Sequence, residues 1–462
     1  MPPHQAVPSS VPPFLALPPE IREQIYSTLL RSANNRVEAT NDPYPDRQKE
    51  RDEDEIGPTY KFDLRVLRVC HQIYDEAKKI WRKNVFVKVT TGWEKAIQHV
   101  NVEGNVGLVL RDNLDPAIRP ARDFQNFHLR ALVESPAFHL HTNEMFSLVT
   151  CFEDVEAYAR IWQFSHLNSG RGLNPHLSLR LDLMNPYDPY GESSALPKSL
   201  QQRLLLPFGK VKDLLDTTFD FHKSPFFPSG LVDPAVRSAI LAQQTIPAPT
   251  PSECLERCNN LLQSGKALFE EGIYDSALSD FMKAFEHIHI FNHGRHREIH
   301  CDHYYTQDDI LSASTPFKGQ NASGVRMCLR LELVLYVVKT YIQSRAWSEA
   351  YFWGKRSIRA IRRSMDETDE IGGREWDAWV TDLQREEFGG REDLLQLFVE
   401  TEDAGRKVME RGAESGVKRE WEHGWEELGD EEGWRRAMGE LRDLESACLI
   451  LVGRTERSKF RA

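Results

Sequence analysis

The sequence of 462 residues has no surplus of positive charge and no long apolar run. Its 58 lysine and arginine residues face 70 aspartate and glutamate residues, so the net charge is -12 at pH 7. This balance argues against binding to nucleic acid or to an anionic membrane, since both favour a cationic surface. The longest apolar stretches, near 331–342 and 447–452, fall far short of the ~20 residues that span a bilayer. No membrane span is therefore expected.

The first residues lack the features of a secretory signal peptide. The segment 1–12 is rich in proline and has neither a basic start nor an apolar core, so we expect a disordered tail. Seven scattered cysteines are typical of reduced thiols rather than of a disulfide framework. We therefore expect a cytoplasmic or nuclear protein with two or three domains.

Motifs of common enzyme classes are also missing. The sequence has no glycine-rich phosphate loop, no GxSxG turn and no HExxH helix. Carboxylates such as Glu153, Asp154 and Asp182 are more typical of solvated faces and helix starts than of a general acid and base. We therefore predict that the protein is not an enzyme and needs no cofactor.

The stretch 14–30, FLALPPEIREQIYSTLL, predicts a short amphipathic helix. Proline and an acidic residue both favour the first turn of a helix, and here Pro18 and Pro19 precede Glu20. The apolar residues that follow have the three-and-four spacing of one helix face. They are Ile21, Ile25, Leu29 and Leu30.

A second stretch, 64–86, LRVLRVCHQIYDEAKKIWRKNVF, continues the helical pattern. Its apolar residues keep a helical period as far as Trp81. Val85, Val87 and Val89 then switch to a period of two, which predicts a strand. Helices are therefore expected to lead into a sheet.

These two stretches resemble the F-box, and more closely the F-box-like N-terminal domains of many fungal proteins. The family pattern is LPxEIRxxIYxxLL, followed by LxxVCxQIYxEAxxxxxxNxF. The first part is matched by Leu17, Pro18, Glu20, Ile21, Arg22, Ile25 and Tyr26. The second part is matched by Val69, Cys70, Gln72, Ile73, Tyr74, Glu76, Ala77, Asn84 and Phe86. The chain departs from a compact F-box because 31–61, with a charged run at 46–55, intervenes.

The resemblance implies a docking module for the adaptor of a cullin-RING ubiquitin ligase of the SCF type. The rest of the chain would then act as a receptor that presents a protein substrate or peptide segment. Exposed apolar side chains on a short helix can form the buried centre of an interface. The adaptor-docking residues expected on this basis are Leu17, Pro18, Ile21, Ile25 and Leu29. In the alternative interpretation, the amphipathic helices only cap the domain that follows them.

The segment 91–222 predicts a mixed sheet domain. Short stretches alternate between apolar and polar residues, as half-buried strands do. Candidate strands are 176–183, 106–110 and 217–221, and candidate helices between them are 93–100, 152–162 and 200–206. The polar face of the strand at 176–183 suggests that helices cover only one side of the sheet.

Prolines accumulate in 223–252, which predicts an extended linker and a domain boundary. Beyond it, 253–365 resembles the tetratricopeptide repeat (TPR), in which small residues let two antiparallel helices approach closely. The matching positions, expected to serve in packing, are Gly265, Gly272, Tyr274, Ala277, Phe281 and Ala284. A weaker second copy can be placed on 333–361, with Trp347, Ala350 and Ser357 at matching positions.

The last segment, 366–462, shows apolar stripes flanked by heavy charge, which predicts amphipathic packing helices. Together with the helices of 13–90, which carry a disordered charged insert at about 34–60, and the sheet domain, these patterns predict an α+β protein. A TPR-like scaffold unrelated to ubiquitin ligation is an alternative function.

Six histidines gather between 287 and 303. A helix there would place His296 and His300 on one face near Cys301, and these are possible zinc ligands. The cluster lacks a distant partner pair, so we expect a solvated loop between repeats and no metal. A metal-dependent hydrolase built on this cluster is a further alternative.

Overall fold

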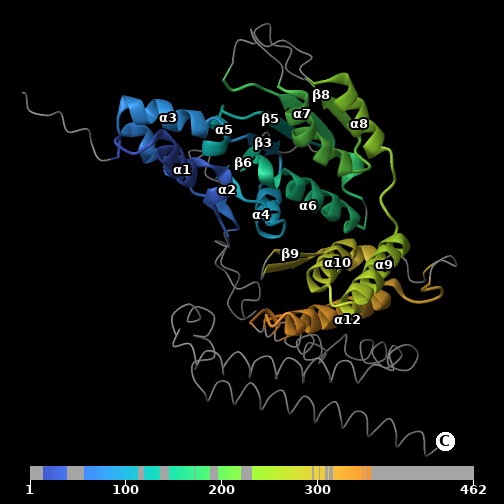
Figure 1. Cartoon of the computed structure of the whole chain (residues 1–462). Helices are drawn as coiled ribbons and strands as arrows, with labels where there is room; N and C mark the ends of the chain where they lie inside the picture. The colour runs from blue at the N-terminus through green and yellow to red at the C-terminus, as the bar shows by residue number, and fades with distance from the viewer. Residues whose placement is uncertain are drawn as a thin grey trace, which may run out of the picture. The chain divides into compact units, whose positions relative to one another are not determined.

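The computed structural model describes residues 14–38, 57–112, 119–135, 145–170, 172–187, 196–219, 232–293, 296–300, 302–306, 311, 316–346, 348–350 and 352–354. The chain forms two compact units. The first contains 1–248 with 300–304, and the second contains 249–299 and the residues from 305 onward. Figure 1 shows the helices and the sheet of the first unit and the helices of the second. The protein is of the α+β class.

The first unit opens with helices α1 (Pro19–Leu30) and α2 (Ser32–Asn35), a 3-10 helix η1 (Leu64–Arg68) and helix α3 (His71–Trp81). The start of α1 is fixed by Pro18 and Pro19, since proline suits a position where the amide hydrogen would have no partner. Helices α1 and α3 share a buried apolar cluster. Its fully buried members are Tyr26, Leu30, Ile73, Ala77 and Ile80.

Eight strands form the central sheet, in the order β1-β2-β4-β6-β3-β5-β7-β8. They are β1 (Arg36–Val37), β2 (Thr59–Tyr60), β3 (Phe86–Thr91), β4 (Leu108–Arg111), β5 (Leu129–Glu134), β6 (Phe146–Cys151), β7 (Ser178–Leu183) and β8 (Asp216–Phe219). Pairs β2·β4, β3·β5 and β7·β8 are parallel, and the other four are antiparallel. The strands predicted near 85–89, 106–110, 176–183 and 217–221 are confirmed.

Two central strands, β5 and β6, were not predicted. Every residue of β6 is buried, because β4 and β3 pair with its two edges and side chains cover both of its faces. The sequence of such a strand does not alternate between apolar and polar residues. Strand β5 does alternate between buried and half-buried residues, so its sequence LRALVE carried a signal that was missed.

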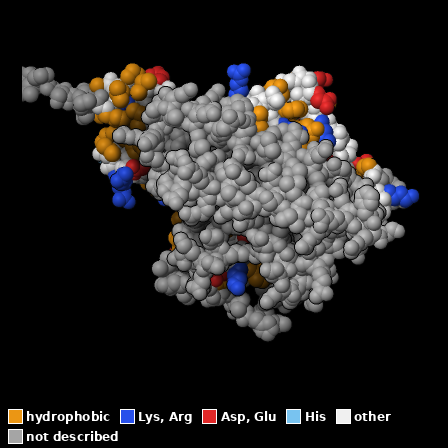
Figure 2. Space-filling view, turned by 90° about the horizontal axis from the view of Figure 1, so that it is seen from below, with side chains coloured by type: hydrophobic (Ala, Val, Ile, Leu, Met, Phe, Trp, Pro, Cys, Tyr) orange, Lys and Arg blue, Asp and Glu red, His pale blue; other side chains and the backbone are white. Residues whose placement is uncertain are grey.

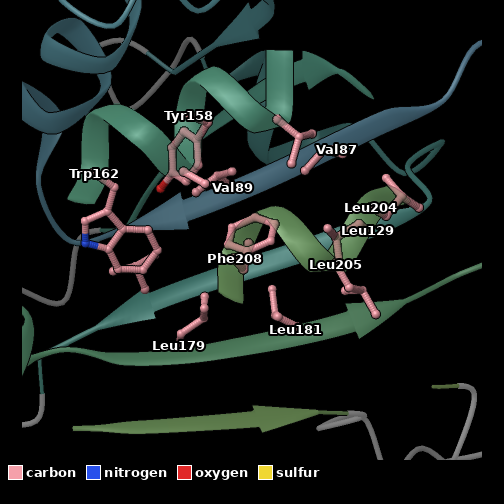
Figure 3. Close-up of a cluster of buried hydrophobic side chains, with 14 of the residues drawn as sticks. Val87, Val89, Leu129, Tyr158, Trp162, Leu179, Leu181, Leu204, Leu205 and Phe208 are labelled. Carbon is pink, nitrogen blue, oxygen red and sulfur yellow. The ribbon is translucent and has the colours of Figure 1, made fainter. Parts of the chain in front are cut away.

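One face of the sheet packs against helices α4 (Glu94–Val102), α6 (Val155–Leu167), α7 (Lys198–Leu205) and α8 (Pro234–Gln244). Figure 3 shows this core, in which Tyr158 and Trp162 of α6, with Phe208 of the 3-10 helix η4 (Leu206–Lys210), lie over the strand side chains. The strand residues labelled there are Val87, Val89, Leu129, Leu179 and Leu181.

The opposite face of the sheet is less uniform. A smaller apolar cluster that includes Phe86, Val149 and Phe127 covers part of it, with Trp81 of α3 and Phe124 packed against it. Phe124 follows the short helix α5 (Pro120–Asp123). The remaining described side chains of this face are largely polar. Four helices therefore cover one face, as the polar side of 176–183 suggested, while the other face is covered only in part.

Two predicted boundaries are corrected by the structure. Helix α8 lies inside the predicted linker 223–252, because Asp233 caps it and Val236 and Ile240 enter the core of the first unit. The predicted insert at about 34–60 begins and ends in strands β1 and β2, which pair with each other and extend the sheet. Residues 1–13 and 39–56 lie outside the described part.

Asp154 and Asp182, interpreted as part of a solvated face or a helix start, are both buried, and Asp154 does lie at the start of α6. Asp154 accepts hydrogen bonds from the Tyr60 hydroxyl at 2.7 Å and from the Gly107 amide at 3.0 Å, and burial raises the pKa of its carboxyl. Asp182 is buried and pairs with Arg130 at 2.7 Å. Glu153 is exposed, and the Ser32 hydroxyl donates to it at 2.6 Å. All three have structural partners.

The second unit contains the antiparallel helices α9 (Pro251–Glu270) and α10 (Tyr274–His287) and helix α12 (Ala322–Gln343), which packs against both. Between α10 and α12 in the sequence lie the hairpin strands β9 (Ile290–His293) and β10 (His296–Ile299). The short helix α11 (Asp302–Thr306) follows, and its first residues belong to the first unit. Helix α9 starts at a capping box, in which Thr250 and Glu253 bond each other's backbone amides. Among the described residues, none of the helices combines the length and apolarity needed to cross a membrane.

Candidate docking surface

Helix α1 has a buried row and an exposed row, and the apolar residues are divided between them. Residues four apart lie along one side of a helix, and the buried row is Arg22, Tyr26 and Leu30. Ile21 and Ile25 lie beside this row and remain 42% and 36% exposed. The four apolar residues predicted to share one face are therefore split, because an arginine and a tyrosine take part of the inner side.

A hydrogen-bonded group, here called the clasp, holds the buried row of α1 to α3. Its members are Arg22, Tyr26, Gln72 and Glu76. The guanidinium of Arg22 donates twice to the Glu76 carboxylate, with distances of 2.7 and 2.9 Å, and the Tyr26 hydroxyl donates at 2.9 Å. Such two-pronged pairing is the strong geometry for arginine and carboxylate. The amide of Gln72 adds a bond of 3.1 Å.

The clasp perturbs the protonation of two of its members. The hydrogen bonds from Arg22 are the main reason why the pKa of Glu76 falls to about 2. Burial, with the hydrogen bond to Glu76, raises the pKa of Tyr26 to about 12. At neutral pH the carboxylate is therefore charged and the phenol protonated, which is the state that the hydrogen bonds require.

The side chains of Arg22 and Asn84 form hydrogen bonds at the two ends of α1. The guanidinium of Arg22 donates to the carbonyls of Leu15 and Leu17, in the turn before the helix. The Asn84 side chain donates to the Leu30 carbonyl at 2.6 Å and accepts from the Ser32 amide at 3.1 Å. The polar residues of the family pattern therefore form the scaffold. The pattern drew attention to them, yet sequence reasoning assigned them no role.

The five residues expected to contact an adaptor differ in accessibility. Pro18, Ile21 and Ile25 are exposed, whereas Leu17 and Leu29 are half-buried. Leu29 packs against the apolar cluster that α1 shares with α3, and its carbonyl accepts from the Asp63 amide at 3.1 Å. Pro18, Ile21 and Ile25, the α1 row, are therefore the part of the set that faces outward.

More exposed apolar side chains lie on η1, on α3 and between them, and both elements pack against α1. Leu64 and Tyr74 are partly exposed and Val69 is 64% exposed. Figure 2 shows hydrophobic side chains gathered at the end of the molecule where Figure 1 places α1 and α3. Sequence reasoning matched Val69 and Tyr74 to the family pattern but did not place them on a surface.

The same elements carry positive charge. A groove of about 520 Å³ along η1 is lined by Lys61, Phe62, Asp63, Leu64, Arg65 and Arg68. Three of these residues are cationic and one is acidic, in a chain whose net charge is -12. The carboxylate of Asp63 forms an ion pair with Arg65 at 2.7 Å. A partner that covers the apolar residues here would therefore meet a locally basic rim.

The residues expected to pack in the manner of a TPR lie between and at the ends of α9 and α10. Gly265 faces the Phe281 ring so closely that a Cβ atom would lie 2.4 Å from a ring carbon. Ala277 and Ala284 are fully buried. Gly272 takes a φ of +78° in the turn between the helices, a conformation that glycine adopts at no steric cost. The ring of Tyr274 lies 5.7 Å from that of Phe269.

The second repeat copy and the C-terminal segment are described only in part. Leu333 and Val338 are buried in α12, and Ala350 is buried beyond it. Trp347, Ser357 and the segment 366–462 lie outside the described residues.

The histidine-rich segment forms a hairpin, not the helix or loop considered from the sequence. His296 lies in β10, and the ring of His300 stacks at 6.0 Å against Phe164. Cys301 lies outside the described residues. In the part of the chain that the structure describes, no three histidine, cysteine or acidic side chains come together as a metal site would require.

Comparison with protein-family models, with curated proteins and with solved structures finds no match for this chain.

Proposed function

We propose that the protein is a non-catalytic receptor that docks on the adaptor of a cullin-RING ubiquitin ligase of the SCF type. The observation that supports this proposal is the outward position of Ile21 and Ile25 on a helix that buries Arg22. Isolated exposed apolar residues are common on protein surfaces. Here, however, two isoleucines lie one turn apart while Arg22 occupies the inner side.

The chemistry of this surface suits an interface. Burial of apolar surface contributes roughly 25 cal/mol per Å², and isoleucine side chains at the centre of a contact, with charged groups at its rim, resemble the usual anatomy of a protein interface. Pro18 and the two isoleucines would form that centre. Lys61 and Arg68, the groove cations that are not paired with Asp63, would supply a basic rim that favours an acidic partner.

The second unit would select the substrate. Its helices α9, α10 and α12 resemble the TPR in their small packing residues, and such helices commonly offer a surface to a peptide segment. In this proposal a protein substrate binds there and is presented for ubiquitination, so that the chain itself performs no covalent step.

Capture of a purified recombinant adaptor by the full-length chain tests the docking step. The double variant Ile21→Ser with Ile25→Ser removes the exposed apolar side chains, and we expect at least a tenfold loss of capture. The matched control is Leu241→Ser with Ile246→Ser, since these residues are also exposed and apolar but lie at and after the end of α8. Equal capture by wild type and both variants, each with a wild-type melting curve, would refute docking through α1.

A second candidate is a scaffold protein unrelated to ubiquitin ligation, in which α1 and α3 only cap the sheet. It is favoured by the aromatic contacts of Phe62 with Trp81 and Phe86, at 5.1 and 6.2 Å, which tie this region to β3. The two candidates differ in the wild-type result, because a scaffold of this kind would capture no adaptor at all. A metal-dependent hydrolase requires bound metal after purification, which metal analysis measures.

A further inference from the structure

A small pocket lies on the sheet face opposite to helices α6, α7 and α8. Side chains alternate between the faces of a strand, and Val87 and Val89 enter the core beneath those helices. Lys88 and Thr90 therefore lie on the other face. The pocket has a volume of about 170 Å³ and is lined by Lys88, Thr90, Arg122, Arg130, Met145 and Ser147. Three of the six side chains are cations, two are hydroxyls, and none is a carboxylate.

Lys88 is the unusual member of this group, because it is only 7% exposed. Lysine is almost never fully buried unless it is paired. Its ammonium donates to the backbone carbonyls of Arg122 and Phe124 and lies 5.4 Å from the centre of the Phe127 ring. The two carbonyls use two of its three N–H donors, and the third can donate to a ligand. No ion pair of Lys88 occurs among the described residues.

The acidic residues whose charges act on Lys88 are Asp112 and Asp123, and neither forms an ion pair with it among the described residues. One oxygen of Asp112 accepts from the amides of Ala121 and Arg122, both at 3.0 Å, and the other accepts from the Ser147 amide at 2.8 Å. Asp123 is exposed. Burial, and then the charge of Arg130, lower the pKa of Lys88, and the charges of Asp112 and Asp123 oppose this shift.

The strand register also places a second positive charge beside Lys88. Lys88 of β3 and Arg130 of β5 are register partners in a parallel pair, and the charge of Arg130 disfavours the charged form of Lys88. Arg130 is balanced by Asp182, its neighbour on the other side, at 2.7 Å. Lys88 has no carboxylate partner of this kind among the described residues. An anion in the pocket would therefore offset both the desolvation of its ammonium and the repulsion from Arg130.

Other residues that line the pocket also offer hydrogen-bond donors. The hydroxyls of Thr90 and Ser147 lie opposite each other in register and 3.1 Å apart. Their mutual bond uses one hydroxyl hydrogen, and the second is left for a ligand. Arg122 is exposed at the mouth, and its guanidinium forms no ion pair within the described part of the chain.

We propose that this pocket binds a phosphoryl group. A tetrahedral oxyanion accepts hydrogen bonds on several oxygens at once, which fits donors that converge from Lys88, Arg122 and one hydroxyl. The volume admits such a group with little attached to it inside the pocket. This site is separate from the α1 row and does not depend on the proposed docking.

Titration of the full-length chain with inorganic phosphate, at constant ionic strength adjusted with chloride, tests the proposal by calorimetry and phosphorus NMR. We expect saturable binding that Lys88→Met abolishes. The matched control is Lys79→Met, since Lys79 is an exposed lysine of α3 outside the pocket. Phosphate binding no stronger than chloride binding, or equal binding by wild type and Lys88→Met, would overturn the proposal.

If Lys88→Met fails to fold, Arg122→Gln takes its place, because the Arg122 side chain is exposed. Loss of a charge-assisted hydrogen bond there is expected to weaken phosphate binding about tenfold, and unchanged affinity would count against the site. O-phosphoserine is titrated in parallel to identify the source of the group. Tighter binding of O-phosphoserine assigns the pocket to a phosphorylated protein, and tighter binding of inorganic phosphate assigns it to the free anion; either order supports a phosphoryl site.

Discussion

The helix pair α1 and α3 adds a charged hydrogen-bonded group to its shared apolar cluster, whereas the buried contact between α9 and α10 is apolar. In the first pair, Arg22 and Glu76 meet through charged hydrogen bonds, and two isoleucines remain outside. In the second pair, Gly265 and Phe281 meet through close apolar contact. A polar clasp fixes the orientation of a helix by directional bonds and leaves apolar side chains available to a partner. Apolar packing uses them within the chain.

The largest loss of stability among the proposed substitutions is expected in the pair α9 and α10. Phe281→Ala should cost about 3–5 kcal/mol of unfolding free energy, because its ring is fully buried against Gly265 and lies 5.7 Å from Tyr336. Hydrogen exchange of the amides of α9 and α10, with and without urea, measures this loss. A change below 1 kcal/mol would show that the apolar contact does not hold the pair together.

The corresponding change in the first pair is Glu76→Gln. It preserves the shape of the side chain but removes the charge that Arg22 binds, and we expect a loss of about 2 kcal/mol. Urea unfolding followed by hydrogen exchange of α1 and α3 measures it. Gln72→Ala is the control with a smaller expected effect, since Gln72 contributes one exposed hydrogen bond to the clasp. Equal effects of the two substitutions would contradict the central role of Glu76.

The two pairs should also differ in their response to acid. The pKa of Glu76 is about 2 in the folded protein, against 4.5 for the free side chain. Its contribution is therefore present above pH 4.5 and is lost as the pH falls from 4.5 to 2, since the unfolded state then binds the proton more readily. As the pH falls over this range, the hydrogen-exchange rates of the α1 amides should increase more in wild type than in Glu76→Gln. The loss of unfolding free energy caused by Phe281→Ala should be the same at every pH.

The smallest effect on stability is expected from the α1 row. Ile21→Ser with Ile25→Ser should change the unfolding free energy by less than about 1 kcal/mol, because both side chains already contact water. Thermal unfolding measures it, with Leu30→Ala as the buried comparison. A loss as large as that of Leu30→Ala would mean that the isoleucines serve the fold, and the contrast between the two helix pairs would disappear.

Much of the local structure could be predicted from the sequence. The period of the apolar residues predicted helical structure in 14–30 and 64–81 and a strand at 176–183, because each pattern reports which residues share a face. The structure has α1 at 19–30, α3 at 71–81 and β7 at 178–183. The missed strand β6 and the linker prediction at α8 have different causes. A strand buried on both faces shows no alternation, and in 223–252 the prolines outweighed the helical spacing of Val236 and Ile240.

The candidate surface was predictable only in part. The family pattern selected Ile21 and Ile25, but it gave no reason to place Arg22 and Tyr26 inside. Their burial depends on Glu76, which is 54 residues from Arg22 in sequence. A charged side chain is stable inside a protein only when such a partner is in reach, and sequence spacing does not report that distance.

The sequence by itself determined the helical and strand periods, the small residues at the α9–α10 contact, and the acidic balance of the whole chain. The tertiary structure alone decided which side of α1 faces outward, the order of the eight strands, and the meeting of Lys88, Arg122 and Arg130 in one pocket. The physical reason is that periodicity depends on neighbours along the chain. Buried charge and strand register depend instead on groups that only folding brings within hydrogen-bonding distance.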